Sequence, residues 1–441
     1  MVENLIYIIP GVTVGIIAGF IPGVGVFTSM MLMLPFLYSL EPYQLLTFYI
    51  ALASTTQYIG SITATVFGLP GESSSLPAVK EGHALFQQGQ GSIAISGSAI
   101  GSFLGSLLVL ALVAFFIPTL SQIYQLYNTK IMALVMMLVV VLIVASQKHI
   151  GVAIVMAVVG YYLSQVGCRE ADGVCFMTFS NPDLTTGLPL ISVVAALYVV
   201  PQITRPTEWY KNKSIKLETN FELRALKKYF KHFGASLRGT VIGFVVGFLP
   251  GTGTVVSSNL SYSIEKWWQT KKGKYKLGNY QSLVSAETAN NAAAFTVLLP
   301  LVVFGIPLIP SEALLYDIQM SNGFVMGENF TPKIFFENLA LVLVITNFIA
   351  LIVAWPLAKY VVYIQKLPAK LFKILIWTIL LWALYSVGLK NFQEIYYLIV
   401  FFVLAPFGYL LRKFDTMPLI FTFIIGERLL YIFNTVKALY L

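Results

Sequence analysis

Residues 11–25 read GVTVGIIAGFIPGVG, and residues 239–253 read GTVIGFVVGFLPGTG. Three glycines at four-residue spacing, a phenylalanine, a Pro-Gly step and a final glycine recur in the same order. A second pair of motifs, FGLP at 67–70 and FGIP at 304–307, follows the two blocks. Glycines at this spacing are by themselves ordinary helix-packing positions. Two different motifs repeated in one succession indicate instead that the chain is an internal duplication.

The composition shows which solvent surrounds the chain. Of the 441 residues, 57% are hydrophobic and only 11% are charged. A soluble protein of this length has roughly a quarter of its residues charged. A helix that spans a bilayer needs about 20 mostly apolar residues, and such stretches follow one another along almost the whole sequence. The sequence therefore predicts a polytopic integral membrane protein.

The net charge of +9 is unevenly distributed. The first 200 residues contain four Lys and Arg residues, whereas residues 201–280 contain fourteen. Basic loops between apolar spans are typical of the cytoplasmic side of a membrane protein, where anionic lipid headgroups attract them. This placement argues against nucleic-acid binding.

The charges around the two glycine blocks predict that the blocks face opposite sides. The second block has Arg238 before it and five lysines within 266–276 after it, so both flanks should be cytoplasmic. The first block has no Lys or Arg before Lys80, which suits two periplasmic flanks. Because a Pro-Gly step interrupts the helical pattern of each block, each fits a re-entrant helical hairpin. A single broken spanning helix is the alternative for each block.

We therefore expect an all-α integral membrane protein built from two inverted-topology repeats, each a re-entrant or broken helical hairpin plus about five transmembrane helices. Such repeats recur in secondary transporters. The expected units are a first repeat, a basic cytoplasmic linker and a second repeat, at 1–204, 205–238 and 239–441. The expected spans lie near 43–69, 93–117, 130–146, 150–166, 187–203, 283–306, 334–358, 371–389, 394–410 and 417–436.

The two ends of the first repeat carry further expectations. The N-terminal residues lack the basic start of a signal peptide, so we expect this segment to be retained, with the N-terminus periplasmic. Cys168 and Cys175 are the only cysteines. They are either joined in a periplasmic disulfide or free, and two cysteines do not suffice for a structural zinc site.

The broken segments are the expected binding site. Irregular backbone at membrane depth has amides without helical partners, and lipid cannot satisfy them. Free N–H groups at a helix N-terminus attract anions, while freed carbonyls and hydroxyls can hold a cation. The expected substrate-binding residues are Pro22, Gly23, Gly25, Thr28, Ser73, Ser74, Pro250, Gly251, Gly253, Asn290 and Asn291. The expected ion-coupling residues are Thr55, Glu72, Thr252, Thr254 and Glu287, with a Na⁺ site near the hairpin tips.

A structural explanation competes at every one of these positions. Proline and glycine also kink and pack helices, and Asn and Ser side chains also link helices within a membrane. Polar or ionisable residues inside a span nevertheless indicate function more often than not.

These motifs resemble those of the large membrane subunit of the tripartite tricarboxylate transporters, the TctA type. The resemblance covers most of residues 10–330. It rests on the two glycine blocks and on YIGSITA at 58–64, GLPGESS at 68–74 and ETANNAA at 287–293. Leu308, at the start of the polar loop 307–313, departs from the glycine that the family commonly has after Gly-Ile-Pro. Where the family often shows an acidic-glycine pair after the serines, this chain has EGH at 81–83.

The resemblance implies a three-part importer in a bacterial inner membrane. A periplasmic solute-binding protein captures a carboxylate, a small membrane subunit assists, and this subunit forms the pathway, driven by an ion gradient. It also implies that the matched motifs lie at the substrate and ion sites.

The residues themselves favour alternating access for a small carboxylate, and the resemblance implies that it is a di- or tricarboxylate. The proposed core contains no Lys or Arg, so a coupled Na⁺ suits a multiply charged anion slightly better than a proton on Glu72 or Glu287. A passive anion channel and an autonomous carboxylate carrier remain the alternatives. No cofactor is expected. An enzyme has little support, because the sequence shows no metal-spaced cluster of His, Cys and Asp and no nucleophile motif.

Overall fold

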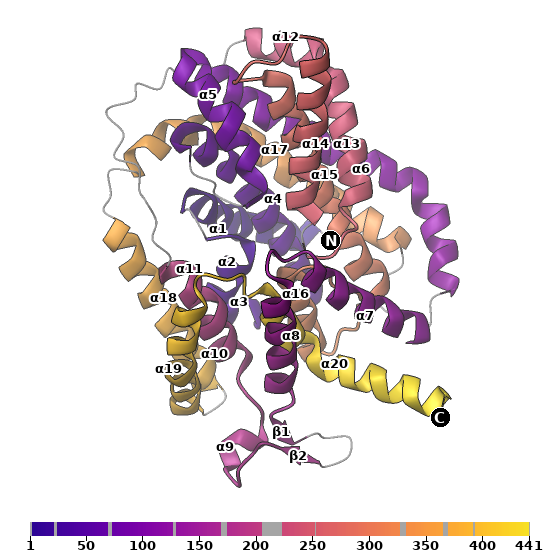
Figure 1. Ribbon diagram of the computed structural model, residues 1–441, viewed down its shortest axis with the longest axis vertical. Helices are drawn as coiled ribbons and strands as arrows, with labels where there is room; N and C mark the ends of the chain where they lie inside the picture. The colour runs from indigo at the N-terminus through magenta and orange to yellow at the C-terminus, as the bar shows by residue number, and fades with distance from the viewer. Residues whose placement is uncertain are drawn as a thin grey trace.

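The computed structural model describes residues 2–21, 24–68, 73–126, 129–168, 174–204, 223–251, 253–326, 332–364, 369–390 and 393–440. Within these residues the protein is almost entirely helical (Figure 1). The exception is a two-stranded antiparallel ribbon, β1 (Gly167–Cys168) and β2 (Cys175–Phe176). Pro22, Gly23, Glu72, Thr252 and residues 205–222 of the expected linker lie outside the described residues.

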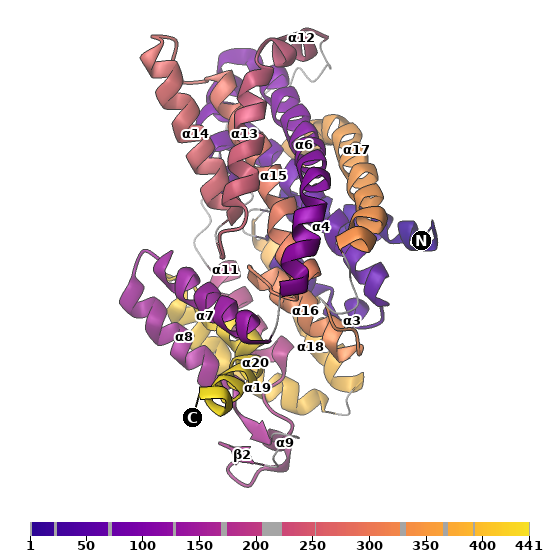
Figure 2. The same cartoon turned by 90° about the vertical axis from the view of Figure 1, so that its right-hand side faces the viewer.

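The helices form two groups along the long axis of the molecule (Figures 1 and 2). We call the first the hairpin group because it holds both glycine blocks. It consists of α1 (Ile8–Phe20), α4 (Pro42–Phe67), α6 (Gly91–Leu126), α13 (Phe233–Val246), α14 (Gly253–Lys271), α15 (Tyr280–Phe304) and α17 (Pro332–Ile364). The flanking group consists of α7 (Thr129–Ala145), α8 (Ile150–Ser164), α10 (Leu190–Val194), the π-helical turn η5 (Ala195–Val199), α11 (Val200–Thr204), α18 (Ala369–Lys390), α19 (Glu394–Leu411) and α20 (Met417–Tyr440).

Short helices connect the two groups. α2 (Val26–Leu32) and α3 (Leu34–Leu37) contact α18, while α16 (Pro310–Ser321) contacts both α2 and α20. The remaining described helical segments are η1 (Val2–Tyr7), η2 (Ser73–Ser75), η3 (Ala78–Gly82), α5 (His83–Leu85), η4 (Phe86–Gln90), α9 (Pro182–Thr185) and α12 (Leu223–Lys231).

Each of the ten expected spans coincides with helical structure, so the prediction of helices there is confirmed. Among the described residues, four stretches are long and apolar enough to cross a bilayer by length and composition: Glu3–Phe20, Ala78–Thr119, Tyr280–Phe304 and Glu394–Leu411. The segment expected as a linker contains α12 and the first turns of α13, which begins at Phe233.

The glycines of the first block hold α1 against α4. A Cβ atom built on any of the three would lie within 2.8 Å of a Cβ atom on α4, in the pairs Gly11–Ala51, Gly15–Thr55 and Gly19–Ile59. Both helices advance by four residues from one pair to the next, so they run parallel. The chain therefore turns back between residues 21 and 41, and α1 is one arm of a hairpin.

The second glycine block packs on α15 in the same register. Cβ atoms built on its glycines would lie 2.7–3.1 Å from Cβ atoms of α15, in the pairs Gly239–Thr288, Gly243–Ala292 and Gly247–Thr296. α13 thus runs parallel to α15, and α14 is the returning arm (Figure 2). The guanidinium of Arg238 on α13 donates to Glu265 Oε2 on α14 at 2.7 and 2.9 Å, which ties the two arms together.

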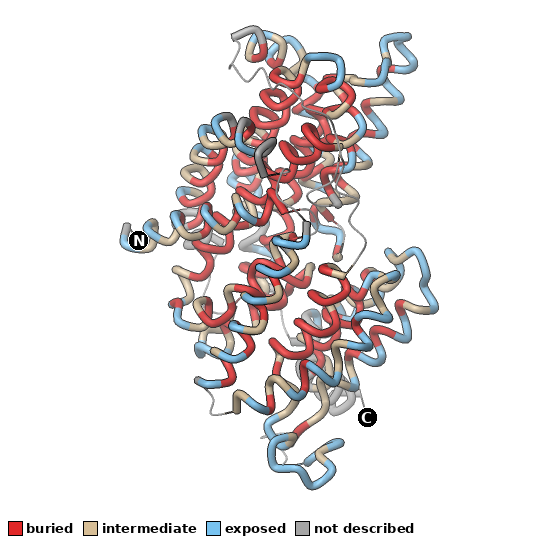
Figure 3. The backbone as a smooth tube through the Cα atoms, turned by 90° about the vertical axis from the view of Figure 1, so that its left-hand side faces the viewer, coloured by how far each residue is buried: buried red, intermediate tan, exposed pale blue. Residues whose placement is uncertain are grey.

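α4 and α15 cross each other in opposite directions. Near the start of α4, Tyr49 Oη lies 3.2 Å from Ser311 Oγ, just beyond the end of α15. Further along α4, Ser61 Oγ donates to Glu287 Oε2 in the first half of α15 at 2.5 Å. Both helices are buried along most of their length, and Figure 3 shows buried backbone running through the centre of the hairpin group.

The ends of these two helices are fastened to the opposite half of the chain. The side-chain amides of Gln319 and Asn322 on and after α16 donate to the carbonyls of Pro42 and Leu40 at the start of α4. At the other end, the backbone N–H groups of Gly278 and Asn279, just before α15, donate to Glu81 Oε2 at 2.8 and 2.7 Å. These contacts link the two halves at both ends.

Cys168 and Cys175 form a disulfide that closes the β1–β2 ribbon. Of the two states that the sequence allows, the structure thus contains the bonded one. The ribbon lies at one end of the long axis, and α12 lies at the other (Figure 1).

Gly243→Ala should destabilise the protein, since its Cβ would lie 2.7 Å from the Cβ of Ala292 and 2.5 Å from the backbone oxygen of Ala289. Overpacking of this kind costs about 1–3 kcal/mol. We expect a lower midpoint of thermal unfolding in detergent. The midpoint is measured by size-exclusion chromatography of heated samples, as the loss of the folded protein's peak. The matched control is Gly151→Ala on α8, where a Cβ meets nothing within 4 Å. Equal midpoints for the two variants would contradict the packing register.

Candidate functional site

The centre of the candidate site is the crossing of α4 and α15, where a carboxylate lies inside the hairpin group. Glu287 on α15 is 1% exposed. Its Oε2 accepts the hydrogen bond from Ser61, while its Oε1 is buried without a protein partner. A buried carboxylate oxygen left without a donor is costly, so this atom is available to a cation or to a ligand that carries a donor.

The two asparagines after Glu287 differ in their contacts. Asn291 donates from Nδ2 to Ser102 Oγ on α6 at 2.7 Å and to the Glu287 carbonyl at 3.1 Å, so it links α15 to its neighbours. Asn290 is fully buried, and neither its Nδ2 nor its Oδ1 has a protein partner. An amide in this state can donate to a carboxylate and accept from a donor at once.

A second set of polar atoms lies where η2 meets α14. Ser258 Oγ on α14 donates to the carbonyl of Ser74 on η2 at 2.7 Å, which joins the last residue of the GLPGESS motif at 68–74 to the second hairpin. The hydroxyls of Ser74, Ser75 and Ser257 are buried and have no protein partner. Because each hydroxyl carries one donor, these serines suit an anion.

The first hairpin adds two hydroxyls. Gly25 has extended backbone and caps α2, and its carbonyl accepts from the N–H and the hydroxyl of Ser29. Thr28 on α2 and Thr55 on α4 are buried, and the hydroxyl of each lacks a protein partner.

The second hairpin tip is held by a backbone hydrogen bond from outside the hairpin. Gly251 has φ +80°, a left-handed turn that favours glycine, and its N–H donates to the Leu308 carbonyl at 2.7 Å. Pro250 is buried at the tip, Gly253 begins α14, and Thr254 is half-buried in its first turn. The first N–H groups of a helix have no partner within it, so this end of α14 can bind an anion.

Besides Glu265, which pairs with Arg238, Glu81 and Glu312 are buried acidic residues that were not predicted as site residues. Glu81, on the π-helical turn η3, is fully buried and accepts four hydrogen bonds, from the Tyr262 and Tyr275 hydroxyls and the Gly278 and Asn279 backbone. Glu312, in the first turn of α16, is also fully buried, but its Oε1 has no protein partner. The available signal for Glu312 was Pro310 followed two residues later by Glu, the start pattern of a helix.

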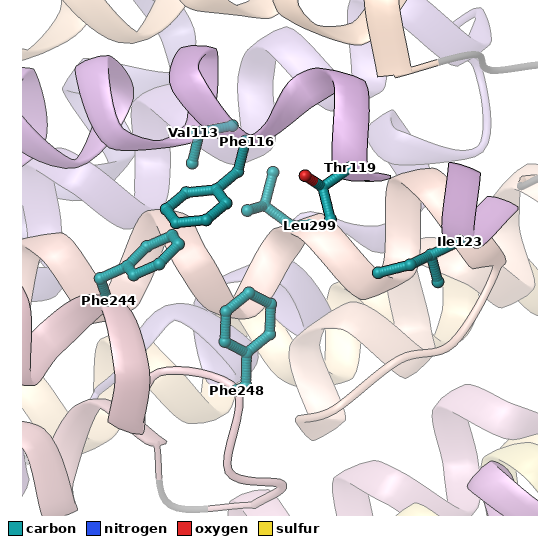
Figure 4. A pocket seen from close by; sticks show the side chains of 7 residues that line it. All are labelled: Val113, Phe116, Thr119, Ile123, Phe244, Phe248 and Leu299. Atoms are coloured by element: carbon teal, nitrogen blue, oxygen red, sulfur yellow. The ribbon is translucent and has the colours of Figure 1, made fainter. Parts of the chain in front are cut away.

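Two cavities adjoin these residues. A small one of about 20 Å³, room for roughly one water, lies between α4, α6, α15 and α17 and is lined in part by Gln57, Ser106 and Asn291. A larger one of about 170 Å³ lies between α6, α13 and α15 and is lined by Phe116, Phe244, Phe248 and Leu299 among others (Figure 4). Its lining is almost wholly apolar, so the larger cavity is not the carboxylate site.

One known protein family matches the chain over most of its length. The model of the tripartite tricarboxylate transporter TctA family matches residues 5–422. The chain belongs to the TctA family. The resemblance seen over most of residues 10–330 is thereby confirmed, and the match continues to residue 422. TctA proteins are multi-pass membrane components of tripartite tricarboxylate transport and are not enzymes.

The TctA protein is similar to two proteins that are named as uncharacterized. An "uncharacterized 52.8 kDa protein in TAR-I ttuC' 3'region" of Agrobacterium vitis is 29% identical over 439 residues, which cover 97% of this chain and 85% of that protein. An uncharacterized protein of Methanocaldococcus jannaschii is 24% identical over 422 residues, 94% of each chain. No solved structure matches the chain.

Asn347→Leu should destabilise the protein, whereas Asn290→Leu should not. Asn347 on α17 is also fully buried, but it accepts from Ser106 Oγ at 2.9 Å and donates to the Leu343 carbonyl at 2.8 Å. Replacing it leaves buried partners unsatisfied, at a cost of about 1–3 kcal/mol. Replacing Asn290 breaks no protein hydrogen bond, so the unfolding midpoint of the unliganded protein should be unchanged or higher. Equal destabilisation by the two substitutions would show that Asn290 is a structural residue.

Proposed function

We propose that this chain is the membrane pathway subunit of a binding-protein-dependent tripartite system that imports a small di- or tricarboxylate. In this proposal transport is secondary, coupled to an ion gradient, and proceeds by alternating access. The observation that carries it is the set of buried polar atoms without protein partners at the α4–α15 crossing and between η2 and α14. A protein keeps such costly atoms where a ligand satisfies them.

In our proposal the two halves, 1–204 and 239–441, are inverted-topology repeats joined by the linker 205–238. The equal packing register of the two glycine blocks and the opposite directions of α4 and α15 support this arrangement. In an inverted pair the two hairpins enter the membrane from opposite faces, and the substrate site lies between them near the midplane.

The substrate carboxylates would be bound by neutral donors. The hydroxyls of Ser74, Ser75 and Ser257, the amide of Asn290 and the free N–H groups at the start of α14 are the candidates among the described residues. Ser73, Pro22 and Gly23, by their places in the motifs, complete the proposed set. Asn291 would act indirectly, through its hydrogen bonds to Ser102 and to the Glu287 carbonyl.

Ion coupling would compensate the negative charge of the substrate. Glu287 Oε1 and the hydroxyls of Thr28 and Thr55 are oxygen atoms of the kind that bind Na⁺, and none has a protein partner. Glu72, Thr252 and Thr254 belong to the same proposed set through their places in the motifs. We favour Na⁺ over a proton at this site, because a bound cation offsets a multiply charged anion without a basic residue.

Alternating access would be a movement of the hairpin group against the flanking group. The two are connected mainly through the short helices α2, α3 and α16. We place the N-terminus and the disulfide ribbon on the periplasmic side of a bacterial inner membrane, since disulfides persist in oxidising compartments. A periplasmic solute-binding protein and a small membrane subunit would be the partners.

The direct test is uptake of labelled di- and tricarboxylates into proteoliposomes that hold this chain with its small subunit, under an inward Na⁺ gradient. We expect accumulation only when both Na⁺ and the binding protein are present. Accumulation without the binding protein would make the chain an autonomous carrier. Equilibration without accumulation would make it a passive channel.

Glu287→Gln should lower Na⁺-driven uptake at least about tenfold, equivalent to about 1.4 kcal/mol, because it removes the charge and keeps an acceptor for Ser61. Uptake is measured against Na⁺ concentration and pH. The control is Glu41→Gln, at the exposed cap of α4. Loss of pH dependence in place of Na⁺ dependence would assign the coupling to a proton on Glu287. Unaltered Na⁺ and pH profiles would remove Glu287 from the site.

A further inference from the structure

Glu312 is a buried carboxyl group beside the second hairpin tip, and neither the expected site nor the proposed transport mechanism uses it. It lies in the first turn of α16, outside the ten expected spans. Its Oε2 accepts the N–H of Leu308 at 2.8 Å, and the backbone of Ile309 also bonds to the carboxyl group. Its Oε1 is buried and has no protein partner.

The carboxyl group is connected to the hairpin tip through a single residue. The carbonyl of Leu308 accepts a hydrogen bond from the N–H of Gly251 at 2.7 Å. The N–H of Leu308 donates to Glu312 Oε2. Glu312 therefore holds Leu308 in place, and Leu308 in turn holds the tip at Gly251. The bond from Gly251 is also the one backbone hydrogen bond that joins the described part of the tip to the segment 305–309.

The surroundings of Glu312 suit a proton better than a metal ion. Ile306, Leu308 and Ala313 belong to an apolar cluster with Ile143 and Phe421, so oxygen ligands for a cation are scarce. The elements packed against α16 are α2, α4, α15 and α20. Their titratable residues are Tyr43, Tyr49 and Tyr58 on α4, Tyr280 and Glu287 on α15, and Glu427, Arg428, Tyr431, Lys437 and Tyr440 on α20, whose side chains lie outside the described part of the structure; α16 itself adds Tyr316 and Asp317. Of the described side chains on the packed elements, Tyr49 comes nearest in the hydrogen-bond network, through Ser311.

Burial and hydrogen bonding act on Glu312 in opposite directions. Burial raises the pKa of the carboxyl group well above its usual range, and the hydrogen bonds from the Leu308 and Ile309 backbone lower the pKa by a smaller amount. Glu81 differs, because both of its oxygens are occupied by four donors. Glu312 thus has an open oxygen for a proton, whereas Glu81 has none.

We propose that Glu312 binds a proton at Oε1 during the transport cycle and that its charge controls how firmly the second hairpin tip is held on Leu308. This inference rests on the proposed transport function and adds to it a proton-sensitive contact. We call this contact the latch; it consists of Glu312, Leu308 and Gly251. As a carboxylate, Glu312 makes a charge-assisted bond to Leu308, which is about twice as strong as a neutral one. Uptake of one proton from solvent neutralises the group, weakens that bond and loosens Leu308 and the tip together.

The test follows the tip directly and needs no transport. A spin label is attached to Leu249→Cys, a 43% exposed position on the tip, in the full-length protein in nanodiscs, and its mobility is measured between about pH 5 and about pH 8. The two native cysteines are bonded to each other and do not react. We expect mobility to rise as the pH falls. Glu312→Gln mimics the protonated group, so its mobility should be high and independent of pH.

Asp317→Asn, on the same helix but five residues further along, is the matched control and should keep the pH response. Uptake by Glu312→Gln should lose its pH dependence while it keeps its Na⁺ dependence. A mobility that does not change with pH in the native background, or that changes equally in Glu312→Gln, would overturn the latch. Failure of the transport proposal would appear separately, as absence of Na⁺-driven uptake in a protein whose tip still responds to pH.

Discussion

A chain that breaks its helices inside a membrane must find partners for the backbone groups that it exposes, because lipid offers none. Here the two glycine blocks meet that constraint by close packing. Without side chains on one face, α1 and α13 lie directly against α4 and α15. The ion pair between Arg238 and Glu265 joins the two arms of the second hairpin, and the backbone hydrogen bond from Gly251 to Leu308 holds its tip. Both the binding site and the proposed latch depend on this packing.

The buried polar groups divide by whether the protein itself satisfies them. Glu81 with four donors, Asn347 with two bonds and Glu265 between Arg238 and Gln269 serve the packing of the two halves. Glu287, Asn290 and Glu312 each have a buried atom without a protein partner. All six are Glu or Asn residues in helices or helical turns, so residue type alone does not separate the two kinds. The difference arises from contacts between residues far apart in the sequence.

That difference explains what could be predicted from the sequence. The helical spans follow from apolar length, so local composition was sufficient for them. The entry of the two hairpins from opposite faces stays a prediction from the Pro-Gly steps and the flanking charges. Whether Cys168 and Cys175 are bonded or free could be decided only from the three-dimensional structure. Glu81 and Glu312 were missed because their importance depends on partners about 200 residues away in one case and on the hairpin tip in the other. Leu308, which first stood out as a departure from the family pattern, proves to be the residue that joins the tip to Glu312.

The central claim is that the two hairpins enter the membrane from opposite faces. Single cysteines at Ser39, between the first hairpin and α4, and at Lys274, between the second hairpin and α15, test it most directly, since both positions are exposed. Each is placed in a background in which Cys168 and Cys175 are replaced by serine, and treated with a membrane-impermeant thiol reagent in cells whose outer membrane has been made permeable. The account predicts that Ser39→Cys reacts at once and that Lys274→Cys reacts only after the inner membrane is broken. Reaction of both from the same side would contradict it.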